Sequence, residues 1–214
     1  MRRVSFLLGL VILAVIWGGP LLASYRNSFA SHMLAHMGVV AIAAPLLAVG
    51  MSGSRFNLLA RSSISTPIVA SVVELFVVWL WHAPAMRALA EGSVLVTVME
   101  QSSFLTAGLF LWLSCVAYRT FEDTAARSGV GALGLLLTSV HMTLLGVLLS
   151  LAPRPLYGFD EVTCFGITLS AQGDQQAGGV IMLAVGAAVY LIGGLVLLGR
   201  ILSEPDAMQR AREP

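Results

Sequence analysis

The sequence predicts an all-α protein that crosses the lipid bilayer several times as a polytopic helical bundle. Of its 214 residues, 57% are hydrophobic and only 11% are charged, whereas roughly 25% of the residues in a soluble domain are charged. Apolar runs also recur along the chain at about the 20 residues that a helix needs to cross a bilayer. The formal net charge of +1 argues against a nucleic-acid partner. We therefore expect an integral membrane protein whose helices are surrounded by the lipid bilayer.

Six segments meet, or nearly meet, the length requirement for a transmembrane helix. They cover about residues 4–23, 32–51, 67–83, 94–118, 129–151 and 177–201. The connections between them are short, apart from the one over residues 152–176. We therefore expect a single transmembrane domain over residues 1–214, with about six spans and no separate soluble domain.

The basic residues predict how this bundle is oriented. All twelve of them are arginine. If the N-terminus is cytoplasmic, only Arg26, Arg87 and Arg154 fall on the outer side. Because loops rich in arginine stay in the cytoplasm, we expect both termini to be cytoplasmic.

The first segment allows two interpretations. It begins with MRR, continues as an apolar run and ends in GGPLLAS, which also resembles a secretory signal peptide with its cleavage site. Residues 1–24 are therefore either a retained helix or a cleaved signal. The orientation of the other five helices is the same in both cases.

The second segment begins with an unusual run of polar and sulfur-containing side chains, SHMLAHM. His32 and His36 are four residues apart, so they lie on the same face of a helix, and Met33 and Met37 repeat this spacing. Imidazole and thioether ligands suit copper, particularly Cu(I). The alternative is structural, because histidines also bridge membrane helices and methionines fill gaps in cores. We expect a metal site at these four residues.

The third segment ends with Trp81 and His82, which the predicted orientation places at the depth of His32 and His36. His82 is therefore a third expected ligand, although it could instead cap its helix, where a cation is favoured. Ionisable side chains inside membranes usually face the bundle interior. On this basis Glu100, His141 and Asp174 are less favoured candidates for the same site.

Other chemistries have little support in the residues. The chain lacks lysine, and it contains no GxSxG, HExxH, Walker or CxxCH motif, so we do not expect an enzyme. Haem held between His36 and a histidine of another helix stays open on residue types. An ion path through Glu74, Glu100 and His141 is a further alternative, because transporters place ionisable groups at several depths.

Five motifs occur in order between residues 31 and 201. They are HMLAHM with AAPLLAVG, WLWHAPAMRALA, MEQSSFLTAGLFLW, LLGVLLSLAPRPLYG and DQQAGGVIMLAVGAAVYLIGGLVLL. As a set they resemble the CtaG family, membrane proteins associated with the assembly of caa(3)-type cytochrome c oxidases. The resemblance implies a factor of the bacterial plasma membrane that helps copper reach the terminal oxidase. It also implies oxidase subunits or other assembly factors as partners, and copper bound only transiently.

The resemblance also assigns residues to family motifs. His32 and His36 match HxxxH, His82 matches WHxP, and Asp174 with the two glutamines after it matches DQQ. Glu100 matches the acid of a motif usually written EHxSF, but the next residue here is glutamine instead of histidine. This departure removes one potential ligand. A copper or small-ion transporter, and a structural assembly scaffold without metal, stay open as alternatives.

Overall fold

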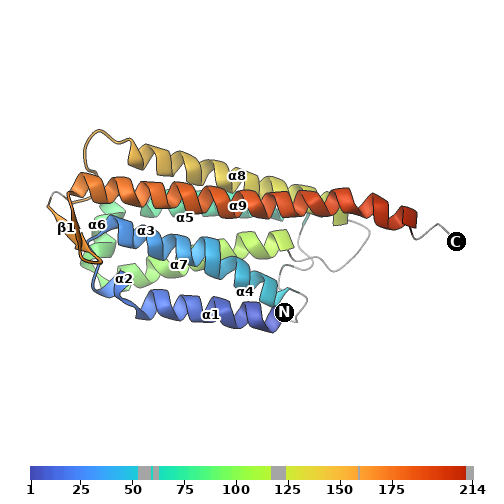
Figure 1. Cartoon of the computed structure of the whole chain (residues 1–214), viewed down its shortest axis with the longest axis horizontal. Helices are drawn as coiled ribbons and strands as arrows, with labels where there is room; N and C mark the ends of the chain where they lie inside the picture. Colours follow the sequence, from blue (N-terminus) through green and yellow to red (C-terminus); the bar gives the residue numbers. More distant parts are fainter. Residues whose placement is uncertain (53–58, 60–62, 117–123, 159, 211–214) are drawn as a thin grey trace.

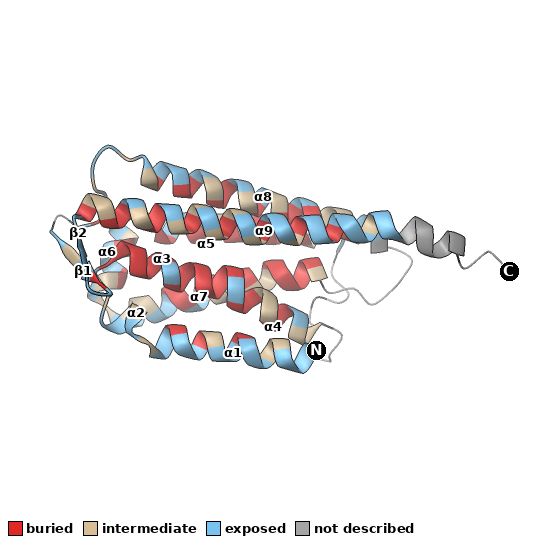
Figure 2. Cartoon of the chain, in the orientation of Figure 1, coloured by how far each residue is buried: buried red, intermediate tan, exposed pale blue. Residues whose placement is uncertain are grey.

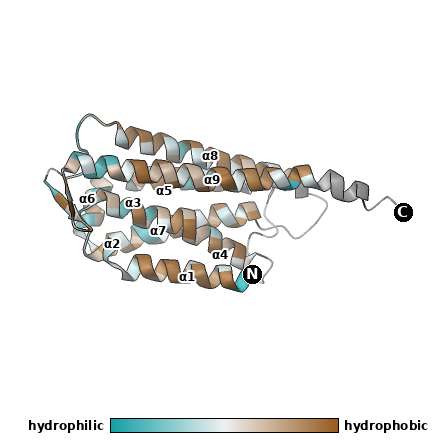
Figure 3. Cartoon of the chain, viewed as in Figure 1, coloured by the Kyte–Doolittle hydropathy of each residue, from teal (hydrophilic) through white to brown (hydrophobic). Residues whose placement is uncertain are grey.

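Polar and apolar side chains are distributed here in the reverse of a water-soluble protein. Large apolar side chains such as Phe76, Leu95 and Val140 are exposed, whereas Glu74 and Glu100 are completely buried. Lipid tails accept apolar side chains, and ionisable groups in a bilayer avoid them by facing the bundle interior. Figure 3 shows the apolar residues running along the helices, with the more polar residues gathered toward their ends. The prediction of an all-α polytopic membrane protein is confirmed.

The computed structural model describes residues 1–52, 59, 63–116, 124–158 and 160–210. Its helices are α1 (Arg2–Gly18), α2 (Pro20–Ala23), α3 (Phe29–Met37), α4 (Ala44–Met51), α5 (Thr66–Trp81), α6 (Pro84–Gly92), α7 (Val94–Val116), α8 (Thr124–Ser150) and α9 (Ala171–Arg210), with a π-helix η1 (Gly38–Ala43) between α3 and α4. Two short strands, β1 (Val162–Cys164) and β2 (Ile167–Leu169), come immediately before α9 in the chain and pair antiparallel.

Among the described residues, five helices are long and apolar enough to cross a membrane, or six if one bent pair counts as a span. The five are Arg2–Ala23, Phe29–Met51, Val94–Val116, Ala125–Ser150 and Ala171–Ser203, and the bent pair is α5 with α6. The predicted segments therefore correspond one by one to these elements. The boundaries differ at the second, third and last spans, for which local causes follow, and at α8, which begins at Thr124 instead of 129.

The third predicted span, 67–83, is where the structure differs most. Helix α5 has only 16 residues, or about 24 Å at 1.5 Å per residue, less than the roughly 30 Å of a hydrocarbon core. The chain then bends by 70° into α6. Ala83 is extended, as the residue before a proline prefers, and Pro84 starts the new helix at a position where its missing N–H costs nothing.

The second and last helices begin earlier than predicted, because side chains cap them. Ser28 caps α3 by accepting a hydrogen bond from Ser31 N at 3.1 Å, so that α3 starts at Phe29. Ser170 Oγ accepts from Gly173 N at 3.2 Å in front of α9. The hairpin of β1 and β2 lies in the predicted connection 152–176 and turns through Phe165 and Gly166, both with positive φ, as a two-residue turn requires.

Both termini lie at one end of the bundle, whereas α2, α6 and the β-hairpin lie at the other end, which we call the hairpin end (Figure 1). The predicted orientation makes this the outer end. Helix α3 runs through the middle of the bundle, and Figure 2 shows it as the most buried helix. Eight of its nine residues are buried. The interior of the bundle is therefore arranged around α3.

The π-helix η1 allows the second span to continue past Pro45. Proline removes one backbone hydrogen bond and clashes with the preceding turn of an α-helix, and a wider turn relieves both problems. The Val40 carbonyl oxygen within η1 instead accepts a hydrogen bond from Trp112 Nε1 at 3.1 Å, and the Tyr190 hydroxyl lies 3.5 Å from it. These contacts tie the second span to α7 and α9.

Candidate functional site

Three of the four histidines meet inside the hairpin end of the bundle. The ring centroids of His36 and His82 are 5.3 Å apart, those of His32 and His82 are 5.9 Å apart, and those of His32 and His36 are 6.5 Å apart. All three side chains are buried, with exposed fractions of 2%, 0% and 4% for His32, His36 and His82. We call these three residues the histidine cluster. The structure thus brings together the three histidines singled out in the sequence.

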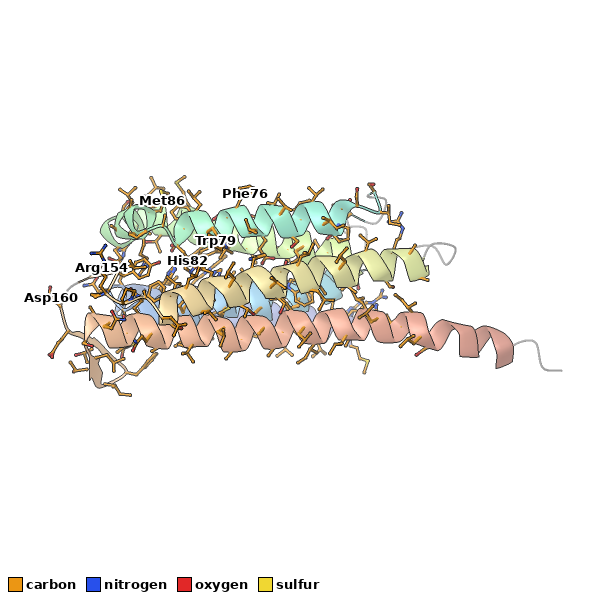
Figure 4. The ribbon with its side chains drawn as sticks, turned by 90° about the horizontal axis from the view of Figure 1, so that it is seen from above. Phe76, Trp79, His82, Met86, Arg154 and Asp160 are labelled. Carbon is orange, nitrogen blue, oxygen red and sulfur yellow. The ribbon has the colours of Figure 1, made fainter. Side chains whose placement is uncertain are left out.

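The local sequence explains how these rings are placed. The i, i+4 spacing on α3 stacks the His32 and His36 rings with an angle of only 10° between their planes. His82 is the last residue before the bend that Pro84 imposes, so its side chain turns into the bundle. In Figure 4, His82 lies on the inner side of this bend, whereas the exposed Phe76 points away from the bundle.

Several imidazole nitrogens of the cluster have no hydrogen-bond partner among the described residues. They are His32 Nε2, both ring nitrogens of His36, and His82 Nε2. A buried polar atom left unpaired costs about 1–3 kcal/mol, so such atoms are uncommon in the interior of a protein. His82 Nδ1 lies 2.6 Å from the Val78 carbonyl oxygen. Because a carbonyl only accepts, Nδ1 carries the proton and Nε2 keeps its lone pair.

The separations of the rings fit a shared ligand, although the rings are not yet turned toward it. A point equidistant from the three centroids lies about 3.4 Å from each of them. An imidazole bound to a metal through a bond of about 2.0–2.1 Å has its centroid roughly 3.2 Å away. In the described part of the chain, no group of three or more His, Cys, Asp or Glu side chains already forms a metal site. Binding by the cluster would therefore require the rings to rotate.

The two methionines of the HM pairs lie on another side of α3. A Cβ atom built on Gly178 would lie 3.0 Å from Met33 Cγ, and one built on Gly186 would lie 3.8 Å from Met37 Sδ. Met33 and Met37 therefore face the glycines of α9. The His36 ring instead lies on the side of α7, with its centroid 4.1 Å from that of Phe104. The structure does not bring the thioethers to the histidine cluster.

A buried arginine contacts the cluster from α6. Arg87 Nη1 lies 3.1 Å from His32 Nδ1, and Arg87 Nη2 donates a hydrogen bond to the Arg26 carbonyl oxygen at 2.8 Å. Arg87 Nε also forms an ion pair with Glu91 at 2.9 Å. On the other side, Glu100 Oε2 lies 3.7 Å from the same His32 nitrogen. His32 is therefore the member of the cluster that contacts charged groups.

Asp174 has a different role from the one its motif suggested. Its carboxylate accepts hydrogen bonds from Ser28 Oγ at 2.8 Å, from Phe29 N, and from Ala30 N at 3.2 Å. The carboxylate thus caps the N-terminus of α3, where a negative charge is favoured. Its neighbour Gln175 accepts from Leu156 N at 2.6 Å and donates to the Leu149 carbonyl oxygen at 3.0 Å. These residues hold α3 and the end of α8 against α9.

An aromatic pair covers the cluster on the side of the 152–158 connection. The Phe29 and Tyr157 rings stack with centroids 4.2 Å apart and an angle of 9° between them. The Tyr157 hydroxyl donates to the His82 carbonyl oxygen at 2.6 Å. Burial raises the pKa of the Tyr157 phenol, so it remains a neutral donor at physiological pH. Phe29 and Tyr157 therefore cover the cluster at the hairpin end.

The remaining ionisable candidates lie apart from the cluster. Glu74 on α5 accepts a hydrogen bond from the Tyr190 hydroxyl at 2.7 Å, in the middle of the bundle. His141 on α8 is buried, and both of its ring nitrogens lack a partner among the described residues. No ring contact of the described residues joins His141 to the cluster. The structure therefore separates these two residues from the histidine cluster.

Two residues of the site did not stand out in the sequence. Arg87 looked like one of three outer arginines, and Phe104 looked like one of many apolar residues of α7. The signal for Arg87 was an arginine followed four residues later by an acid, Glu91, in the short segment after His82. Phe104 carried no such signal, because its contact with His36 depends on how α7 packs against α3.

Comparisons with known proteins agree with the motifs. A family model for the cytochrome c oxidase caa3 assembly factor (Caa3_CtaG) matches residues 1–204. No curated protein and no solved structure matches the chain significantly. The matched residues include the histidine cluster and every element from α1 to most of α9. The chain therefore belongs to the family of caa3 cytochrome c oxidase assembly factors.

Proposed function

We propose that this protein carries copper as cargo to a terminal oxidase during its assembly in a bacterial plasma membrane. The observation that supports this proposal is the convergence of three buried imidazoles with unpartnered nitrogens. His36 and His82 are the principal ligands in this proposal, and His32 is the third. The partners would be oxidase subunits or other assembly factors that receive or supply the metal.

The chemistry of the cluster favours Cu(I) over a divalent ion. Burying an ion costs free energy unless groups of opposite charge surround it. The three ligands here are neutral imidazoles beside the apolar ring of Phe104, so they supply no negative charge. A monovalent ion needs less compensation than a divalent one. Cu(I) also accepts two or three ligands, and imidazole is a suitable one. A cargo held by few ligands can be passed on to a partner.

A polar pocket at the hairpin end offers a place for the metal to approach. It has a volume of about 620 Å³ and includes Arg26, Ser28, Glu91, Asp160 and Glu161 in its lining. Three of these five side chains are acidic, and carboxylates raise the local concentration of cations. Ser28 lies one turn of α3 from His32. In this proposal copper arrives over this surface before it reaches the cluster.

Copper quantification on the purified protein tests the proposal. The test compares the wild type with a His36→Ala/His82→Ala double variant after loading with Cu(I) under reducing conditions. The matched control is His141→Ala, which removes a buried histidine outside the cluster. We expect the double variant to lose the bound copper and the control to keep it. Equal copper in all three proteins would show that the cluster does not hold the metal.

A scaffold that binds no metal is the second candidate, because the described residues contain no preformed metal site. Growth of a deletion strain with added copper separates the two functions. Recovery of oxidase activity with copper supports delivery, since excess metal can bypass a carrier. Continued loss of oxidase in copper-rich medium supports a scaffold.

A further inference from the structure

His32 Nδ1 has two charged neighbours, one of which donates hydrogen bonds and one of which accepts them. The Arg87 guanidinium, at 3.1 Å, can only donate a hydrogen bond. The Glu100 carboxylate, at 3.7 Å, can only accept one. A neutral imidazole has one nitrogen with a proton and one with a lone pair. The neighbour that His32 Nδ1 bonds therefore fixes which ring nitrogen carries the proton.

The two bonding arrangements have opposite consequences for metal binding. When Nδ1 accepts from Arg87, the proton must be on Nε2, and Nε2 then has no lone pair for a metal. When Nδ1 donates to Glu100, Nε2 keeps its lone pair and can bind. In this structure the shorter contact is the one with Arg87. The other ring nitrogen, Nε2, has no partner among the described residues.

His82 provides the contrast within the same cluster. Its Nδ1 is bonded to the Val78 carbonyl oxygen, which can only accept, so its Nε2 always keeps a lone pair. This arrangement, with the far nitrogen bonded to an acceptor, is the usual one for a histidine that binds metal. His36 has both nitrogens free of partners among the described residues. Two members of the cluster thus keep a nitrogen lone pair for a metal, whereas His32 is held in the other tautomer.

We propose that Arg87 and Glu100 are positioning residues that select the tautomer of His32 and so set whether the cluster offers two or three ligands. This inference rests on the proposed copper-carrying function. With Arg87 bonded to His32, copper has two nitrogen ligands and leaves easily. With Arg87 withdrawn, the ring proton moves from Nε2 to Nδ1 and is donated in a hydrogen bond to Glu100. His32 Nε2 then has a lone pair and becomes the third ligand, and the copper is held more tightly.

The position of Arg87 makes such an exchange possible. Its Nε and Nη2 are held by Glu91 and by the Arg26 carbonyl oxygen, so only Nη1 reaches His32. Glu100 Oε2 accepts a hydrogen bond from Gln101 Nε2 at 3.4 Å, whereas Oε1 has no partner among the described residues. The carboxylate can therefore accept a further hydrogen bond from His32 Nδ1. Arg87 and its partner Glu91 both belong to α6, the short helix after the 70° bend. A small displacement of α6 would therefore change the ligand set.

Nitrogen-15 NMR of the metal-free protein, with selectively labelled histidine, tests the tautomer directly. We expect wild-type His32 to carry its proton on Nε2. In Arg87→Met the donor is lost and Glu100, which accepts, is the charged neighbour that remains, so we expect the proton to move to Nδ1. Arg87→Lys is the matched control, because lysine still only donates, and it should behave as the wild type. A proton on Nδ1 in the wild type would overturn the inference without any need for a variant.

Cu(I) X-ray absorption and competition titration then test the ligand number. We expect two nitrogen ligands in the wild type and three in Arg87→Met, with about tenfold tighter binding. Adding His32→Ala to Arg87→Met should remove this gain. Equal ligand numbers in the wild type and Arg87→Met would overturn the inference even where His36→Ala/His82→Ala abolishes binding. If neither protein binds copper, the proposed function fails, whatever the tautomers are.

Discussion

Buried side chains have different roles on the two sides of α3: on one side they pack and form hydrogen bonds, and on the other they are available to bind a ligand. On the side of α9, Met33 and Met37 pack against glycines, and Asp174 pairs with the N-terminus of the helix. On the side of α5 and α7, His32 and His36 keep ring nitrogens without partners among the described residues. On the first side the side chains are packed and hydrogen-bonded, and they hold the helix in place. The second keeps a capacity for binding, at a cost in stability that the first side offsets.

The largest effect that we expect comes from the capping carboxylate. Asp174→Ala removes the acceptor of three buried donors on the first turn of α3. Hydrogen bonds to a charged group contribute about 1.5–3 kcal/mol each, so we expect at least about 3 kcal/mol of destabilisation. Thermal unfolding in detergent measures this loss. The control is Gln176→Ala, because Gln176 is an exposed neighbour. An unchanged melting temperature for Asp174→Ala would show that its carboxylate does not stabilise α3.

A medium effect is expected where α9 packs against α3. A Cβ on Gly178 would lie 2.4 Å from Phe29 Cδ1, so Gly178→Ala should displace Phe29 and destabilise the protein by about 1–3 kcal/mol. Gly199→Ala is the matched control on the same helix, because no atom lies within 4 Å of a Cβ there. We expect it to be neutral or stabilising by up to about 1 kcal/mol. Equal thermal unfolding of the two variants would mean that this contact is not tight.

The smallest effect separates packing from binding at the methionines. A Met33→Leu/Met37→Leu double variant keeps the apolar volume, so each change should cost less than about 1.5 kcal/mol. Because both thioethers face α9, we expect the copper content and affinity to stay at the wild-type level. Titration with a Cu(I)-specific chelator measures both quantities. A marked loss of affinity would instead favour the ligand role that the sequence suggested for Met33 and Met37.

Features that depend on neighbouring residues could be predicted from the sequence. Hydropathy located every span, because crossing a bilayer requires about 20 apolar residues in one run. The spacing of His32 and His36 placed their rings on one helix face, because four residues make about one turn. Pro84 marked the end of the third span. The depth of His82 followed from the same count of spans.

Features that depend on contacts between distant residues needed the tertiary structure. Asp174 caps a helix that begins 145 residues earlier in the chain, and no local pattern reveals such a partner. The stack of Phe29 on Tyr157 that covers the cluster joins residues 128 positions apart in the chain. The fold also gave the methionines and the histidines of the HM pairs different neighbours. Adjacent residues on a helix point about 100° apart, and both methionines meet α9 whereas His36 meets Phe104 of α7. The sequence thus determined which side chains are available at this depth, and only the packing of the helices decided which of them meet.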